Sequence, residues 1–500
     1  MPTPLLIGDL IRKNAKTHPL RVAAWMDGVS LTFAELDQAA DRVGHALRNE
    51  GVAHGDRVVT WADTGLEVLP LFVALARLGA VFAPLNARLG QAEALPIVEM
   101  AEPRMLVADA AHLEGAMAVA RELGIERVGS FSAAEEDAKV IDLRLDSLAP
   151  SPTLLDEPAL SETDPHVIFF TSGSTGAPKG VVLSHRANYL RSYQGVFLAE
   201  HERSVCMFPL FHMAAFTLAL SAWQTQGEIA FVREATAEQI LEAVEARKAN
   251  RLYCIPAVWN RILAVGVDRF DTSSLRFIDT GTSATPIELL KALKDRFPDS
   301  VLRIYYGSTE AGAGTTLMDT DALGKPGSVG LPSPGVDLRI GEGGEICLRT
   351  HYLMDGYFNN PEATREALQE GWYHTGDIGV LDEEGFLSVI GRMKDLIRTG
   401  GEGVAPTEVE AALSTHPGIR ELAVVGIPDP QWGEVICAVV VPEEGVSITL
   451  ESLQETSVEV LAGFKKPRRL EVVSALPRTS ATGQVQRLLL VEQITARVPE

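Results

Sequence analysis

The chain has 500 residues, of which 46% are hydrophobic and 22% charged, and its 67 acidic residues against 44 basic ones give a net charge of −23. This length exceeds one hydrophobic core, so two or more domains are expected. The acidic balance argues against nucleic acid or an anionic membrane as partner. Four widely spaced cysteines predict buried free thiols. Without a signal peptide or an apolar run long enough to span a bilayer, a cytoplasmic protein with no integral membrane segment is expected.

The first part of the chain alternates between predicted strands and helices. Thr32 followed by Glu35 has the spacing of a capping box, which predicts that a helix begins there. The alternation predicts an α/β layered domain with a largely parallel sheet. Its further elements are predicted strands over 56–61, 80–85 and 104–108 and a predicted helix over 71–78 that ends near Gly79.

The most distinctive stretch is 171–180, which reads T-S-G-S-T-G-A-P-K-G. It follows 147–165, a polar, proline-rich segment expected to be a surface connection, and 166–170, an apolar run that predicts a buried strand. Glycines let the backbone approach an anion, and Lys179 adds a charge suited to phosphate. The spacing differs from that of the common phosphate loop. A flexible linker is the alternative, which the buried strand immediately before this stretch disfavours.

The middle of the chain contains three further predicted strands, and two of them run into loops of small residues. Because ligands bind where the strands of open α/β sheets end, these loops and 171–180 predict one shared nucleotide site. Glu310 suits Mg²⁺ bound together with phosphates; a helix N-terminal charge is the alternative. His212 lies in an apolar segment, where a lone histidine is more often a core residue. The strands are 252–255, 275–278 and 301–305, the loops are 280–284 and 306–310, and a helix capped by Ser184 is expected before them.

The last third changes to short strands and tight turns. A hairpin is predicted over 380–387, and after Gly391 a helix over 407–413, strands over 421–427 and 435–441 and a helix over 450–461 follow. That is a small α+β domain of ordinary size. The predicted fold is therefore a large N-terminal domain of layered α/β subdomains with a β-rich subdomain (1–394), hinged to a small α+β C-terminal domain (395–500).

With these motifs in order along nearly the whole chain, the sequence resembles the adenylate-forming superfamily of acyl-CoA synthetases, aryl-CoA ligases, luciferases and peptide-synthetase adenylation domains. The resemblance implies that a carboxylic acid attacks the α-phosphate of ATP, giving acyl-adenylate and pyrophosphate, and that the thiol of CoA then displaces AMP. The segments that carry it are 31–36, 79–86, 171–180, 306–310, 372–377, 391–395 and 400–410.

The resemblance also implies roles for individual residues. Glu310 holds Mg²⁺, Thr309 contacts the α-phosphate region, and His212 borders the carboxylate site. The β- and γ-phosphates are held by Thr171, Ser172, Gly173, Ser174, Thr175, Gly176 and Lys179. The adenine and ribose are held by Gly281, Thr282, Ser283, Tyr306, Gly307, Asp377 and Arg392, although the pair Thr282-Ser283 is less usual there.

The C-terminal domain of the family rotates between two catalytic conformations. By resemblance, Lys394 and Asp395 form the hinge, and Gly400 and Gly401 face the thiol tunnel in the second conformation. In the first conformation a C-terminal lysine enters the site, but here Gln484 stands at that position. Glutamine carries no charge. We therefore expect slow adenylation and retained thiol transfer from preformed acyl-adenylate.

The expected function is that of an AMP-forming acyl-CoA synthetase for a fatty acid, using ATP, Mg²⁺ and CoA. No acidic residue follows His212 where amino-acid-activating relatives bind the substrate ammonium, which favours an apolar acyl or aryl acid. The alternatives are a non-catalytic ATP- or acyl-adenylate-binding pseudoenzyme, supported by Gln484 alone, and a stand-alone aryl-acid adenylating enzyme; a luciferase is less favoured. The sequence leaves the acid, its chain length and a homodimer open.

Overall fold

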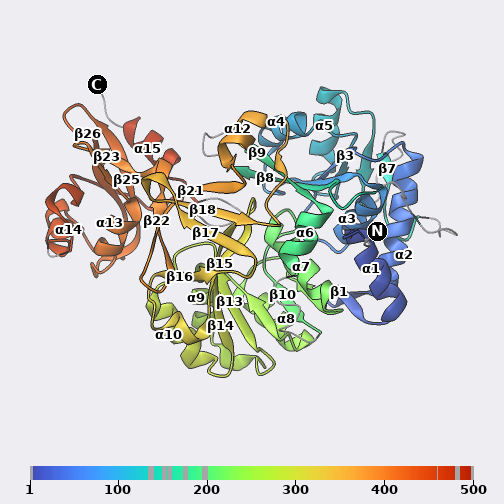
Figure 1. Cartoon of the computed structure of the whole chain (residues 1–500), viewed down its shortest axis with the longest axis horizontal. Coiled ribbons are helices and arrows are strands. Elements are labelled where there is room, and N and C mark those ends of the chain that lie inside the picture. Colours follow the sequence, from blue (N-terminus) through green and yellow to red (C-terminus); the bar gives the residue numbers. More distant parts are fainter. Residues whose placement is uncertain are drawn as a thin grey trace. The chain divides into compact units, whose positions relative to one another are not determined.

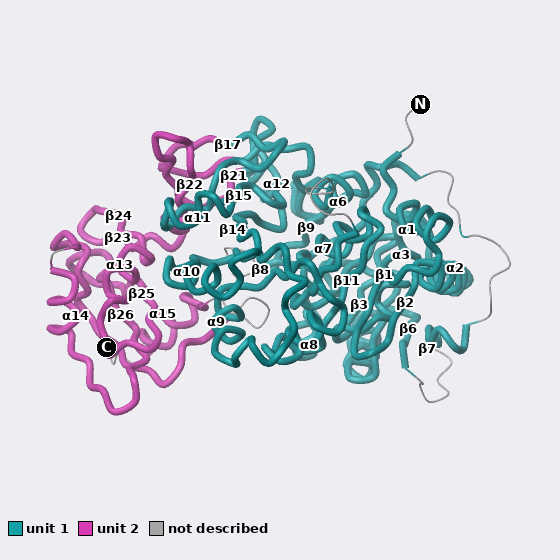
Figure 2. Tube along the Cα trace, turned by 90° about the horizontal axis from the view of Figure 1, so that it is seen from below, with its two compact units in different colours: residues 1–338, 348–373 teal, residues 339–347, 374–500 magenta. Residues whose placement is uncertain are grey.

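The structure is a computed structural model that describes residues 4–132, 140–148, 155, 160–172, 178–193, 201–458, 460–478 and 485–496. The chain forms two compact units (Figure 2): unit 1 consists of 1–338 and 348–373, and unit 2 of 339–347 and 374–500. The predicted fold class, a large layered α/β part with a small α+β part, is confirmed. The hinge at Asp395, and with it the boundary between 394 and 395, stays a prediction.

The first sheet of unit 1 has the strand order β19-β9-β8-β4-β3-β5-β6-β7. Figure 1 labels β9, β8, β3 and β7 of this sheet. The strands from β8 to β7 pair in parallel, as predicted, whereas β8, β9 and β19 pair antiparallel. One face is covered by α4 and α5, whose alanines and valines pack on Val59, Leu106 and Ile168. The elements are β3 (Arg57–Trp61), β4 (Val81–Pro84), α4 (Gln91–Ala101), β5 (Met105–Ala108), α5 (Leu113–Leu123), β6 (Val128–Ser130), β7 (Val140–Asp142), β8 (Pro165–Ser172), β9 (Pro178–Ser184) and β19 (Gly356–Tyr357).

The N-terminal helices follow the sequence prediction closely. Thr32 and Glu35 form the predicted capping box at the start of α2 (Phe33–Asn49). Every residue of α3 (Val68–Leu78) is buried, and the helix ends at Gly79, whose φ of 69° is left-handed. The expectation of a surface connection over 147–165 is wrong at Leu155, which is fully buried against Gly44 of α2. The preceding elements are α1 (Ile7–Thr17), β1 (Val22–Met26) and β2 (Val29–Thr32).

A second sheet of unit 1 has the strand order β16-β15-β14-β13-β12-β10-β11-β1-β2. Its strands from β14 to β1 pair in parallel, whereas β15 and β16 on one side and β2 on the other pair antiparallel. This is the second α/β layer that the sequence predicts. The elements are α6 (His185–Ser192), β10 (Arg203–Cys206), α7 (Met213–Gln224), β11 (Glu228–Phe231), α8 (Ala237–Arg247), β12 (Arg251–Tyr253), α9 (Pro256–Val265), β13 (Phe277–Gly281), α10 (Ile287–Arg296), β14 (Val301–Ser308), β15 (Gly312–Leu317), α11 (Asp319–Ala322) and β16 (Ser328–Pro332).

Two predicted loops are shorter than the sequence suggested. β14 continues to Ser308 and pairs with β15, so that 306–310 is the end of a strand and a tight turn. Thr171, Ser172 and Lys179 likewise lie on the paired strands of the β8–β9 hairpin, where Thr171 is opposite Lys179. In both places cross-strand pairing extends the strand into residues whose composition resembles a loop.

Unit 2 is built around the sheet β24-β23-β26-β25, with β27 beside β26. One face packs on α13 and α14 through Val409, Leu413 and Leu453, and the other packs on α15 through Leu490 and Ile494. The helix predicted over 450–461 ends at Thr456. The elements are β23 (Ile397–Thr399), β24 (Glu402–Val404), α13 (Pro406–Leu413), β25 (Ile419–Asp429), β26 (Gly433–Pro442), α14 (Leu450–Thr456), β27 (Arg469–Val472) and α15 (Arg487–Thr495).

The β-rich part of the chain contributes residues to both units, with 348–373 in unit 1 and 339–347 and 374–392 in unit 2. It contains β17 (Val336–Ile340), β18 (Glu345–Thr350), α12 (Pro361–Ala367), β20 (Leu368–Gln369), β21 (Trp372–Leu381) and β22 (Leu387–Arg392). The hairpin predicted around 380–387 is confirmed by β21 and β22. None of the helices in the described part of the chain is both long enough and apolar enough to cross a bilayer.

Candidate nucleotide site

The phosphate-loop candidates lie on the hairpin of β8 and β9. Thr171 Oγ1 donates to the carbonyl of Lys179 at 3.5 Å. The ammonium of Lys179 lies 4.7 Å from the ring centre of Tyr357, which is within cation–π range. Gly173, Ser174, Thr175 and Gly176 lie outside the described residues, as does the side chain of Ser172.

Glu310 lies in the turn after β14. Its Oε1 accepts a hydrogen bond from the hydroxyl of Tyr357 at 3.0 Å, and its carbonyl accepts from the N–H of Met354 at 2.7 Å. Tyr357 therefore contacts both the candidate phosphate lysine and the candidate metal carboxylate. Carboxylate oxygen is the ligand that Mg²⁺ prefers, so Glu310 fits the predicted metal role.

Arg191 holds the backbone of the turn that contains Thr309 and Glu310. This buried residue of α6 donates to the carbonyl of Thr309 at 2.8 Å and to that of Tyr352 at 2.9 Å. Burial lowers the pKa of Arg191 to about 10, so the guanidinium keeps its charge at neutral pH. Thr309 and Glu310 thus sit on a backbone held by a charged hydrogen-bond donor.

The adenine candidates come together at the ends of β13 and β14. Gly281 pairs with Tyr305 and has a φ of 154°. A Cβ on Gly281 would come within 2.3 Å of the Tyr305 carbonyl and 2.8 Å of the Tyr253 hydroxyl, so only glycine fits there. The pairing places Tyr306 and Gly307 next to Gly281, while Thr282 and Ser283 are exposed. Gly281 and the pair Tyr306-Gly307, which are predicted to contribute to one nucleotide site, therefore lie close together on adjacent strands.

His212 caps helix α7 rather than lying in the middle of an apolar core. Its Nδ1 accepts from the N–H of Ala214 at 3.2 Å, and its ring stacks on Phe208 at 5.4 Å. Burial lowers the pKa of His212 to about 4, so the imidazole is neutral at physiological pH. Phe216 and Trp223 of the same helix are fully buried, which leaves Met213, Ala214 and Thr217 on its more accessible side.

The ribose candidates form a pair within unit 2. Asp377 of β21 lies opposite Arg392 of β22, and its Oδ1 accepts from Arg392 Nε at 2.9 Å. Lys394 and Asp395 follow in a 3₁₀ turn, Met393–Asp395. Gly400 and Gly401 have φ values of 61° and 87° in the turn between β23 and β24. Gln484 lies outside the described residues.

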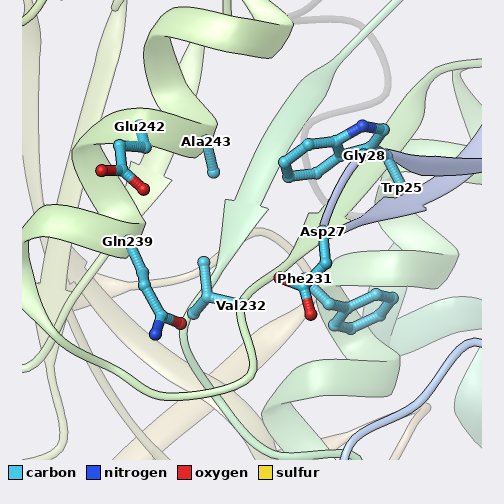
Figure 3. A pocket seen from close by; sticks show the side chains of 8 residues that line it. All are labelled: Trp25, Asp27, Gly28, Phe231, Val232, Gln239, Glu242 and Ala243. Carbon is cyan, nitrogen blue, oxygen red and sulfur yellow. The ribbon is translucent and has the colours of Figure 1, made fainter.

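A pocket of about 250 Å³ on unit 1 involves none of these residues. Figure 3 shows that Gln239 and Glu242 of α8 line one side of it and Trp25, Asp27 and Phe231 the other. The pocket therefore shares no residue with the candidate nucleotide site. That site is described by its hydrogen bonds and its strand pairing.

Comparison with known proteins decides the family. Residues 11–358 match the family described as AMP-binding enzyme, and 408–482 match its C-terminal domain. The chain is 34% identical to a feruloyl-CoA synthase of an Amycolatopsis species, covering 96% of this chain and 98% of that one. It is 31% identical to the long-chain-fatty-acid–CoA ligase FadD13 of Mycobacterium tuberculosis, with 99% of each chain covered. The chain belongs to the AMP-binding enzyme family. The predicted adenylate-forming acyl-CoA synthetase superfamily is thereby confirmed.

The structure of this AMP-binding enzyme is similar to a solved one as well. The ATP-bound MatB of Rhodopseudomonas palustris matches with a TM-score of 0.85 and 28% identity, over 97% of this chain and 98% of that one. Tyr357 and Arg191 are the residues that sequence reasoning missed. Neither lies in a motif that we assigned to the nucleotide, and Tyr357 is 47 residues from its partner Glu310.

Proposed function

We propose that the chain is an AMP-forming acid–thiol ligase that converts a carboxylic acid to acyl-adenylate and then to an acyl-CoA. The observation that carries this proposal is the joint contact of Tyr357 with Lys179 and Glu310, because it brings a phosphate-binding cation and a metal-binding carboxylate to one place. The names of the relatives, both of them enzymes that make CoA thioesters, support the same reaction class.

In the first step a carboxylate oxygen of the acid attacks the α-phosphorus of ATP, and pyrophosphate leaves. Lys179 and the hairpin residues hold the β- and γ-phosphates, and Thr309 contacts the α-phosphate region. Glu310 holds Mg²⁺, which when bound neutralises charge on the phosphate oxygens. Asp377 and Arg392 bind the ribose hydroxyls. In the second step the CoA sulfur attacks the acyl carbon, and AMP leaves.

A neutral His212 suits the border of the carboxylate site. With its pKa lowered to about 4, the imidazole leaves the charge of the acid uncompensated, so it positions the carboxylate without binding it as an ion pair. Its Nδ1 accepts from the N–H of Ala214, so the proton of the neutral ring lies on Nε2. The acid thus keeps the charge that makes it a nucleophile.

The acid is a fatty acid in our proposal, because α7 presents Met213, Ala214 and Thr217 and no charged group beside His212. An aryl acid is the second candidate. The similarity to a feruloyl-CoA synthase favours it, and so does the small size of the Ala214 side chain, which leaves room for a ring.

Gln484 at the lysine position makes adenylation the slow half-reaction in this proposal. The loss of one preorganised charge or donor at such a site costs about 3 kcal/mol, or roughly a hundredfold in rate. Transfer from preformed acyl-adenylate does not use this position in the proposed second conformation, so it is retained. The rotation between the two conformations takes place at Lys394 and Asp395 and brings Gly400 and Gly401 to the thiol tunnel.

The decisive experiment measures pyrophosphate release with ATP, Mg²⁺ and a panel of fatty and aromatic acids. The Gln484→Lys variant is compared with the parent chain and with Gln486→Lys, which adds the same charge at an exposed position nearby. We expect Gln484→Lys alone to be faster, by about a hundredfold, on one class of acid. If no variant turns over any acid and acyl-adenylate plus CoA gives no thioester, the chain is a non-catalytic binder instead.

A further inference from the structure

Three side chains with metal-binding atoms meet on neighbouring strands of the β-rich part. Glu345 and Cys347 lie on β18 and His374 lies on β21, and all three belong to unit 2, drawn in magenta in Figure 2. Nδ1 of His374 is 2.7 Å from Oε2 of Glu345 and 3.7 Å from Sγ of Cys347. Three potential ligand atoms thus lie within 4.8 Å of one another.

These separations are close to those of a tetrahedral zinc site. Bonds of about 2.3 Å to sulfur and about 2.0 Å to nitrogen separate those two atoms by about 3.5 Å, near the 3.7 Å present here. Nitrogen and oxygen would be about 3.3 Å apart, so the carboxylate has to retreat by about 0.6 Å from the imidazole. A side-chain rotation of Glu345 supplies that shift without moving the strand.

The surroundings also suit a partly open site. Glu345 Oε1 accepts the N–H of Gly376 at 2.9 Å, which orients the carboxylate while Oε2 faces the cluster. The side chains of Glu345 and His374 are 15% and 21% exposed, so an ion has access from solvent, whereas Cys347 is buried. Burial, and after it the neighbouring Glu345 carboxylate, raise the pKa of the Cys347 thiol, and Arg339 offsets part of this rise. Coordination of a metal deprotonates such a thiol outright.

We propose that Glu345, Cys347 and His374 form a site for a borderline-soft divalent cation, of which Zn²⁺ is the natural example. Thiolate and imidazole are the ligands that favour Zn²⁺ over Mg²⁺, so the site is chemically distinct from Glu310. Binding releases the thiol proton to solvent and leaves the His374 proton on Nε2. The fourth position is taken by water.

A second cluster in the described part of the chain, Asp63, Asp109 and His112, provides an internal control. Both ring nitrogens of His112 have hydrogen-bond partners: Nδ1 lies 2.6 Å from Asp109 Oδ1, and Nε2 lies 2.7 Å from the carbonyl oxygen of Ala87. It offers no sulfur. A cation bound there, or at Glu310, would give no thiolate spectrum.

The test is a Co²⁺ titration of the full chain, stripped of metal and kept reduced, without nucleotide. We expect a thiolate-to-cobalt charge-transfer band that saturates at one equivalent and disappears when Zn²⁺ is added. Cys347→Ser abolishes the band, whereas Cys437→Ser, at a buried cysteine of the same unit, and His112→Asn leave it unchanged. A band that is missing from the parent chain, or that persists in Cys347→Ser, would overturn the proposal.

X-ray absorption of the zinc-loaded parent chain gives a readout that does not depend on the folding of a variant. We expect one sulfur at about 2.3 Å among nitrogen and oxygen ligands at about 2.0 Å. A shell of nitrogen and oxygen alone would contradict the assignment of Cys347. The measurement uses no activity assay, so it stands apart from the proposed ligase reaction.

Discussion

The hydroxyl of Tyr357 donates a hydrogen bond to Glu310, the proposed Mg²⁺ ligand. Tyr357→Phe keeps the ring that faces Lys179 and removes the hydrogen bond to Glu310. A hydrogen bond to a charged group is worth about 2 kcal/mol, roughly thirtyfold in an equilibrium. In the Gln484→Lys background we expect a higher Mg²⁺ concentration at half-maximal pyrophosphate release and an unchanged KM for the acid.

The matched control is Tyr193→Phe, at a tyrosine that is 40% exposed at the end of α6. An unchanged Mg²⁺ dependence in Tyr357→Phe would show that the hydroxyl does not orient the carboxylate. A KM for the acid that rises in step would indicate general damage to the site.

The sequence predicts phosphate and metal roles for Lys179 and Glu310 because each lies in a short motif whose residue types match a chemistry, and these roles stay predictions. It could not reach Tyr357, since that side chain is placed by the pairing of β19 with β9, in which Tyr357 is opposite Val181. His212 shows a related difficulty. Its sequence context predicts a core residue, while its capping bond to Ala214 depends on where helix α7 begins.

At the scale of the element, the second sheet of unit 1 depends on a buried ion cluster beneath the adenine candidates. Asp279 of β13 is fully buried and accepts from Arg303 at 2.7 Å and from Arg251 at 2.6 Å. These cations keep the pKa of Asp279 low even though burial alone would raise it. Asp279→Asn removes a charged partner of the buried Arg303 and leaves Arg251 paired with Glu202, at 3.1 Å.

We therefore expect Asp279→Asn to lower the free energy of unfolding by about 3–5 kcal/mol, measured by denaturant titration. The comparison is Asp337→Asn, which breaks an exposed pair with Arg349 and should cost at most about 1 kcal/mol. Equal effects of the two substitutions would mean that the buried cluster contributes no more than a surface pair.

The sequence predicts well those helix ends that are set by residues close to them in the chain. The capping box at Thr32 and the glycine that ends α3 are both local, and both are confirmed. Leu155 differs, because its polar neighbours in the sequence predict a surface position. Its side chain is in the core because it packs against Gly44, which has no side chain to exclude it. The length of β14 is likewise decided by its partner β15.

At the scale of the whole molecule, two stacked histidines make stability depend on pH. The rings of His166 and His185 lie 4.7 Å apart in the core of unit 1, and both are fully buried. Burial lowers the pKa of His185 from 6.5 to about 4, and it also lowers the pKa of His166 well below its usual value. The unfolded chain therefore binds these protons first as the pH falls.

It follows that the free energy of unfolding decreases as the pH falls from about 6.5 to about 4. The decrease is about 3 kcal/mol for His185 alone. Denaturant unfolding at a series of pH values measures this slope. His185→Asn should flatten it, whereas His351→Asn, at an exposed position, should not. Identical slopes in all three proteins would rule out the buried pair as the cause. The contribution of Asp142, whose pKa is lowered to about 2, lies below this window.

The proposed reaction cycle has its hinge at Lys394 and Asp395. Asp395 ends a 3₁₀ turn, and its carboxylate lies 4.0 Å from Arg487, which also binds Glu410 at 2.7 Å. Proline fixes φ near −65°, so Asp395→Pro should stop rotation at this residue, whereas Asp395→Ala removes the ion pair and leaves φ free. If the two half-reactions need different settings of the hinge, the proline variant alone should separate them.

In the Gln484→Lys background we expect Asp395→Pro to change the ratio of pyrophosphate release to thioester formation by about tenfold or more, which corresponds to about 1.4 kcal/mol between the two settings. Thioester formation is followed from preformed acyl-adenylate and CoA, so that each half-reaction is timed on its own. Should the alanine variant change the ratio equally, the loss of the Arg487 pair would be responsible. Should both rates fall in step, Asp395 would not be the hinge, because a residue that only supports folding affects both steps alike.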